Sequence, residues 1–160
     1  MRRGLGTGRL VVGVGSALAV VGAFLPWTYF GGAQFGLPFQ TRNAFDGAGV
    51  LMFIAATALL ALLILPYAAA SGRSSLDRWV SFVILGALMV VGTLLQLLQL
   101  FKDGALKLLP LTDVLGMWLG IVGTLLVAWG VAQIVGQETR ARSADGPRQM
   151  TTFRDRRRKQ

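Results

Sequence analysis

The chain has 160 residues, of which 54% are hydrophobic and only 14% are charged, yet its 16 Lys and Arg residues against 7 Asp and Glu residues give a net charge of +9. High apolarity together with a basic excess indicates a membrane protein in which apolar segments and basic residues occupy different parts of the chain. Cysteine and histidine are both missing, which excludes disulfides, thiol chemistry, histidine-ligated metals and a histidine general base.

Four uncharged runs predict four transmembrane helices, because a bilayer core of about 30 Å needs about 20 helical residues. In chain order we place these spans at about 10–30, 46–69, 78–101 and 113–136. The predicted fold class is an all-α integral membrane protein, an up-and-down bundle of four transmembrane helices. Residues 1–137 form the membrane domain, and residues 138–160 form a basic cytoplasmic tail that is expected to be disordered when free.

The first span crosses the bilayer only if its helix continues past Pro26 to about Phe30. A cleaved signal peptide is the alternative, since Ala17-Leu-Ala19 resembles a cleavage site. The sequence after that site stays apolar as far as Leu25 instead of turning polar. This continuity favours a retained helix.

The following loop, residues 27–42, is aromatic and rich in glycine, and Gly31-Gly32 can form a hairpin turn. So many aromatic side chains are too apolar to be freely solvated. They are expected at the membrane interface, in a cap on the bundle or against a partner. The candidate contact residues of the loop are Trp27, Tyr29, Phe30, Phe35 and Phe39.

Capping signals precede the later spans. Asn43 and Ser74 each stand three residues before a carboxylate, Asp46 and Asp77, in the arrangement of a capping box. The pair Thr112-Asp113 can cap the fourth span in the same way. We therefore interpret these carboxylates as helix caps rather than as catalytic groups.

The uncharged runs on which these spans are based contain no Asp, Glu, Lys or Arg, whereas carriers coupled to ions and proton relays normally need an ionisable residue within the membrane. Of the polar residues that remain, Gln96 and Gln99 share one face of the third helix. They either hydrogen-bond to neighbouring helices or line a path for a solute, and the first interpretation is favoured because two uncharged amides make a weak binding site.

Small residues follow alternating steps of four and three along the first and fourth spans. Such stripes allow two helix backbones to approach closely. We predict that the two stripes pack on each other within the bundle, with packing against a partner as the alternative. The helix-packing residues are Gly15, Ala19 and Gly22 on the first span, and Gly116, Gly120, Gly123 and Gly130 on the fourth.

The distribution of positive charge predicts the orientation. With both termini in the cytoplasm, 13 of the 16 basic residues lie inside, which agrees with the positive-inside rule. The location that follows is the bacterial inner (plasma) membrane, crossed several times. The tail is expected to contact anionic lipids rather than nucleic acid. Its candidate lipid or partner contacts are Arg154, Arg156, Arg157, Arg158 and Lys159.

Two segments of the sequence resemble those of a known group of membrane proteins. Phe24-Leu-Pro-Trp27, followed by a glycine- and aromatic-containing loop and then Asn43-Ala-Phe-Asp-Gly47, resembles a diffuse group of small, mostly uncharacterised four-helix membrane proteins of actinobacteria and other high-GC bacteria. The layout is also similar to that of claudin-like proteins, although the loop cysteines and the Gly-Leu-Trp signature of that family are missing. The resemblance covers about 25 residues and implies a fold without implying a chemistry.

These observations favour a non-enzymatic membrane protein without catalytic, metal or cofactor sites. We expect an accessory, scaffolding or assembly subunit of a membrane complex, with a membrane-protein partner or self-association. A channel or carrier for a small neutral or lipid-like solute, lined by Gln96, Gln99 and nearby threonines, is the alternative. A membrane enzyme comes third, with Asp46 and Asp113 as outer carboxylates close to spans.

Overall fold

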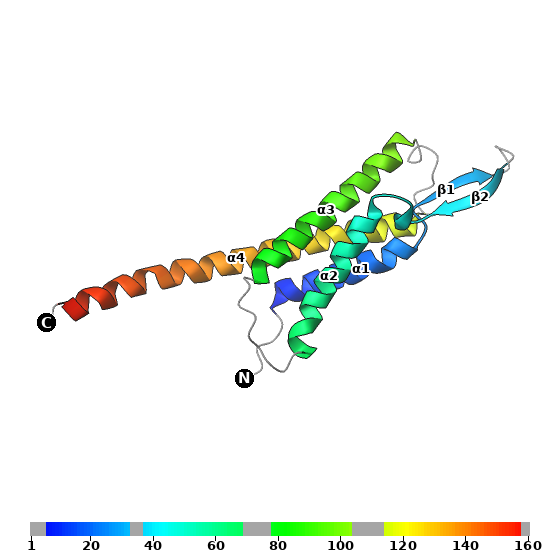
Figure 1. The fold of residues 1–160 in the computed structure, drawn as a ribbon. Coiled ribbons are helices and arrows are strands. Elements are labelled where there is room, and N and C mark those ends of the chain that lie inside the picture. Colours follow the sequence, from blue (N-terminus) through cyan, green and yellow to red (C-terminus); the bar gives the residue numbers. More distant parts are fainter. Residues whose placement is uncertain (1–5, 33–36, 69–77, 104–113, 158–160) are drawn as a thin grey trace.

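A computed structural model describes residues 6–32, 37–68, 78–103 and 114–157, and it is mostly helical. Its elements in chain order are helix α1 (Thr7–Phe24), strands β1 (Thr28–Gly32) and β2 (Leu37–Arg42), the short 3₁₀ helix η2 (Ala44–Asp46), and helices α2 (Gly49–Ala68), α3 (Arg78–Lys102) and α4 (Leu115–Arg157). Helix α1 contacts α2 and α4, and α3 contacts the same two helices. The hairpin leaves one end of this bundle, and α4 extends beyond the other (Figure 1).

Three helices are long and apolar enough to cross a membrane: Thr7–Phe24, Trp79–Lys102 and Leu115–Gln137. The apolar part of α2, Gly49–Leu65, is shorter. Large apolar side chains face outward on every helix, for example Phe24, Ile64 and Leu125, each more than 60% exposed. Exposed apolar surface on this scale is typical of helices surrounded by lipid, so the chain is a membrane protein.

The prediction that the first span continues to about Phe30 is wrong. Helix α1 ends at Phe24, and Leu25 has extended dihedral angles (φ −82°, ψ 159°). The residue before a proline is sterically pushed out of the helical region, so Pro26 ends the helix through Leu25. Strand β1 follows from Thr28, in a segment of β-branched and aromatic residues that favour strands.

Strands β1 and β2 pair antiparallel, with Thr28 opposite Arg42 and Phe30 opposite Gln40. The expected hairpin is therefore present, but Gly31 and Gly32 belong to β1 instead of forming its turn. The register shifts between Phe30 and Gly32, where the ladder is irregular. Residues 33–36, which join the strands, lie outside the described residues.

The fourth helix continues where a disordered tail was expected, since α4 runs from Leu115 to Arg157. Arginine, a good helix former, is the commonest residue of the tail, and extending an existing helix needs no new nucleation. The helix includes Gly146 and Pro147, which disfavour a helix interior. Figure 1 shows this continuation projecting beyond the other helices as one rod.

The predicted small-residue stripes of α1 and α4 pack on each other, and the two helices run antiparallel. A methyl group added to Gly15 would lie 2.7 Å from the carbonyl oxygen of Gly123. One added to Gly22 would lie 2.9 Å from the carbonyl oxygen of Gly116, and one added to Gly8 would lie 3.1 Å from that of Gly130. The backbones thus touch at three levels, seven residues apart on α1.

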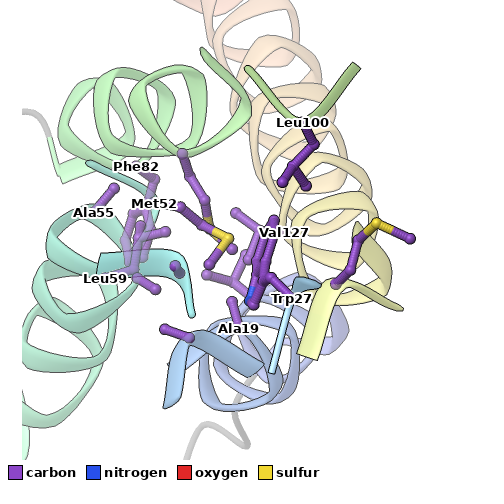
Figure 2. Close-up of a cluster of buried hydrophobic side chains, with 14 of the residues drawn as sticks. Ala19, Trp27, Met52, Ala55, Leu59, Phe82, Leu100 and Val127 are labelled. Atoms are coloured by element: carbon purple, nitrogen blue, oxygen red, sulfur yellow. The ribbon is translucent and has the colours of Figure 1, made fainter. Parts of the chain in front are cut away.

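Buried apolar side chains from all four helices fill the space beside this contact (Figure 2). Trp27, Met52, Leu59, Met89 and Val127 are fully buried. Two hydroxyl groups join α3 to α4, since Thr93 Oγ1 lies 2.8 Å from Thr124 Oγ1. Each hydroxyl also lies within hydrogen-bond distance of a carbonyl of its own helix, on Met89 and Gly120.

Substitution of Gly15 by Ala tests the helix contact. The new methyl group would overlap the α4 backbone, and we expect the free energy of unfolding to fall by about 1–3 kcal/mol. Gly13→Ala on the same helix is the matched control, because its methyl group would lie 3.4 Å from Leu63 Cδ1, an ordinary contact. Reversible unfolding in detergent micelles measures both, and equal stability of the two variants would contradict the proposed contact.

Candidate functional site

The end of the bundle that carries the hairpin holds the densest group of polar contacts in the described chain. It is built from the base of the hairpin, η2, the start of α2 and the last turns of α3. The sequence had marked several of its residues as candidates, namely Trp27, Gln96 and Gln99. Their geometry shows whether they are free to act on a ligand.

Trp27 attaches the hairpin to the bundle. Its indole Nε1 donates a hydrogen bond to the carbonyl of Gly22 in α1 (2.9 Å), and its backbone N–H donates to Arg42 of β2 (2.8 Å). The ring lies against Gly120 of α4, where an added methyl group would be 2.7 Å from Cζ2. Pro26 next to it accepts a bond from the N–H of Gly116 (3.1 Å). A two-stranded hairpin is marginal alone, and these contacts anchor it.

Trp27 is therefore not a partner contact, because it is fully buried in the core. Of the three expected placements of the loop aromatics, the cap on the bundle is therefore the one that agrees with Trp27. Tyr29 is half-buried and packs against the core. The side chains of Phe30 and Phe39 and all of Phe35 lie outside the described residues, so these three stay predictions.

Gln96 and Gln99 of α3 cap the beginning of α2. The Oε1 atom of Gln96 accepts from the backbone N–H of Gly49 (2.8 Å), and that of Gln99 accepts from Ala48 (3.1 Å). The first N–H groups of a helix have no partner within it, and an unpaired one is costly away from water. The two amides remove this cost. These bonds agree with the prediction that Gln96 and Gln99 hydrogen-bond to a neighbouring helix.

Glycine at position 47 makes this cap possible. A methyl group there would lie 2.5 Å from the Oε1 atoms of both Gln96 and Gln99. Gly49 is equally constrained, since its methyl group would lie 2.6 Å from the carbonyl oxygen of Ala44. A side chain at position 47 would displace the two capping amides, and one at position 49 would collide with Ala44 of η2.

The predicted capping box at Asn43 is confirmed. Asn43 Oδ1 accepts from the N–H of Phe45 (3.0 Å), and Asp46 Oδ2 accepts from the N–H of Asn43 (3.0 Å). The capped element is η2, and α2 begins three residues after Asp46. The corresponding pairs at Ser74–Asp77 and Thr112–Asp113 lie outside the described residues.

A small polar pocket of about 30 Å³ opens beside these caps. Its volume suits a single water molecule and is too small for an organic substrate. The hydroxyl of Thr28, a wall residue, is buried and has no hydrogen-bond partner among the described residues. The residues that line this pocket are Thr28, Arg42, Asn43, Asp46, Gln96, Gln99, Leu100 and Asp103. Within the described part of the chain, no three His, Cys, Asp or Glu side chains gather to hold a metal ion.

The structure also contains an aromatic cluster that the sequence reading missed. Phe24 of α1, Phe45 of η2 and Phe53 of α2 contact one another, with ring centroids 5.0–5.6 Å apart in tilted and edge-to-face geometry. Phe24 is 62% exposed. Phe45 and Phe53 belong to separate elements, and nothing in the sequence places Phe24 beside them.

The structure describes only part of the tail residues that the sequence suggested as lipid or partner contacts. Arg154, Arg156 and Arg157 belong to α4, but the structure does not describe their side chains. Arg158 and Lys159 lie outside the described residues. Their role as lipid or partner contacts stays a prediction.

These features define a helical membrane protein with a β-hairpin fixed to one end of its bundle. Comparison with family models, with curated proteins and with solved structures finds no match for the chain.

Replacing the capping amides tests their structural role. Gln96 is buried, so Gln96→Leu leaves the N–H of Gly49 without a partner and should lower the free energy of unfolding by about 1–3 kcal/mol. Gln99 is exposed, and water can replace its bond in Gln99→Leu, so a smaller loss is expected. Unfolding of both variants in detergent provides the comparison. A larger loss for Gln99→Leu would contradict this assignment.

Proposed function

We propose that this protein is a non-enzymatic accessory, scaffolding or assembly subunit of a membrane complex. The observation that carries the proposal is the use of its polar groups. Gln96 and Gln99 accept bonds from α2, Thr93 and Thr124 bond to each other, and Asn43 with Asp46 caps η2. Groups that could handle a substrate are instead engaged in holding the bundle together.

The proposed topology has α2 as the fourth span and both termini in the cytoplasm of a bacterial cell. Helix α2 has 20 residues in total, enough at about 1.5 Å each for a core of about 30 Å. The excess of basic residues at the N-terminus and in the tail supports the orientation. The hairpin then lies outside the cell, and the extended α4 lies inside.

Two elements project from the bundle and are available for a partner. The hairpin projects at one end, and α4 continues for about 20 residues beyond its apolar span, Leu115–Gln137, at the other (Figure 1). The tail carries half of the basic residues of the chain, 8 of 16. We propose an integral-membrane partner for the hairpin and anionic lipid, or an acidic partner surface, for the tail.

The alternative of a channel or carrier for a neutral solute depends on the same two glutamines. A lining made by Gln96 and Gln99 predicts that proteoliposome flux falls in the double Leu variant. Their engagement with the N–H groups of Ala48 and Gly49 favours the scaffold instead.

Co-purification of the full-length chain in mild detergent tests the proposal. We expect one partner at constant stoichiometry, retained in Trp129→Leu, which changes an exposed apolar side chain of α4. The partner should be lost when Phe30 and Phe39 become Ser, or when the five basic residues at positions 154 and 156–159 become Gln. A monomer without a recurrent partner, or equal retention by all variants, would overturn the proposal.

A further inference from the structure

An apolar groove runs between α1 and α2 at the end of the bundle where α1 begins. It has a volume of about 380 Å³ and opens outward from the bundle. Its walls are Leu10 and Val14 of α1 and Leu60, Leu63 and Ile64 of α2, and Gly13 forms its floor. Leu10 and Ile64 are 56% and 63% exposed, so the walls rise from the outer surface.

Gly13 leaves space for the groove because it has no side chain, and it is not part of the close contact between α1 and α4. A methyl group there would meet only Leu63 Cδ1, at 3.4 Å. The nearby Gly15, by contrast, is in backbone contact with α4. The two glycines therefore differ in role. Gly15 allows α1 to pack closely on α4, whereas Gly13 leaves space on the outer surface between α1 and α2.

Arg9 stands at the end of this groove, one turn before Gly13. Its side chain is exposed, and no hydrogen bond or ion pair joins it to another residue within the described part of the chain. The first turn of α1 contains no acidic residue. The groove thus combines an apolar trough with one unneutralised guanidinium at its mouth.

We propose that the groove binds one acyl chain of an anionic phospholipid, with the lipid phosphate at Arg9. The surrounding bilayer supplies this ligand, and a guanidinium pairs with phosphate through two parallel hydrogen bonds. The proposal requires that the Arg9 end of α1 lies at a membrane surface, on either side. It is independent of the scaffold function.

A partner helix fits the groove less well than an acyl chain. Gly13 is the one small residue among those that line the groove, and the large side chains of Leu10 and Ile64 in its lining are exposed. A helix needs a longer row of small residues for close approach, and Arg9 would have to enter its interface. A flexible chain fills a narrow trough and leaves the charge at the headgroup level.

Lipid titration by native mass spectrometry tests the site on the full-length protein in detergent, using phosphatidylglycerol and phosphatidylcholine with identical acyl chains. We expect tighter binding of phosphatidylglycerol by the native chain. Arg9→Gln should weaken that binding about fivefold, as expected for about 1 kcal/mol per basic residue. Gly13→Leu, which fills the trough, should remove the tight site for both lipids, and Gly13→Ala should weaken it less.

Matched controls separate this site from bulk effects. Lys102→Gln removes an exposed charge from the end of α3, outside both the groove and the basic tail, and Ala87→Leu adds the same bulk as Gly13→Leu on an exposed face of α3. Both should bind lipid as the native chain does. The proposal is overturned if Lys102→Gln loses as much affinity as Arg9→Gln, if both Gly13 variants bind normally, or if Gly13→Leu changes the oligomeric state and leaves lipid binding intact. Should Gly13→Leu not fold, Arg9→Gln and Gly13→Ala decide the outcome.

Discussion

The structure depends on the backbone contact between α1 and α4. In a bilayer, apolar side chains gain little by leaving lipid for a helix interface, so association relies on close packing. Glycine supplies it here, because Gly8, Gly15 and Gly22 leave no room for any side chain opposite the glycines of α4. The contact also aligns the ends of the two helices. Gly116 then meets Pro26, and Gly120 meets the Trp27 ring, so the position of the hairpin follows from the contact.

The hairpin end of the bundle illustrates how a membrane protein satisfies polar groups without a local helix cap. Helix α2 begins at Gly49, where no Ser, Thr, Asp or Asn is available as an N-cap. Its free N–H groups are satisfied by Gln96 and Gln99 from α3, and Gly47 provides the space for both amides. Without α3, the N–H groups at the start of α2 would lose these acceptors, and without α2, the amide oxygens of α3 would lose their donors. The two helices therefore stabilise each other.

The sequence allowed the helix contact to be predicted because its cause is local, a repeated spacing of small residues that is visible on each helix separately. The capping box of Asn43 and Asp46 was predictable for the same reason. The end of α1 was predicted wrongly because the apolar composition between Leu25 and Phe30 was given more weight than Pro26, which pushes Leu25 out of the helical region. The burial of Trp27 and the partners of Gln96 depend on residues far along the chain: Gly120 lies 93 positions from Trp27, and Gly49 lies 47 from Gln96.

Helix α4 connects the two ends of the molecule. Its first turns hold the hairpin base through Gly116 and Gly120, and the same unbroken helix carries the basic tail as far as Arg157. A helix that is continuous and packed along its span tilts as one body. The close contact with α1 and the base of the hairpin both lie on the helix that also carries the tail. Under the proposed scaffold function, this arrangement would place a partner of the hairpin and a partner of the tail at opposite ends of one helix.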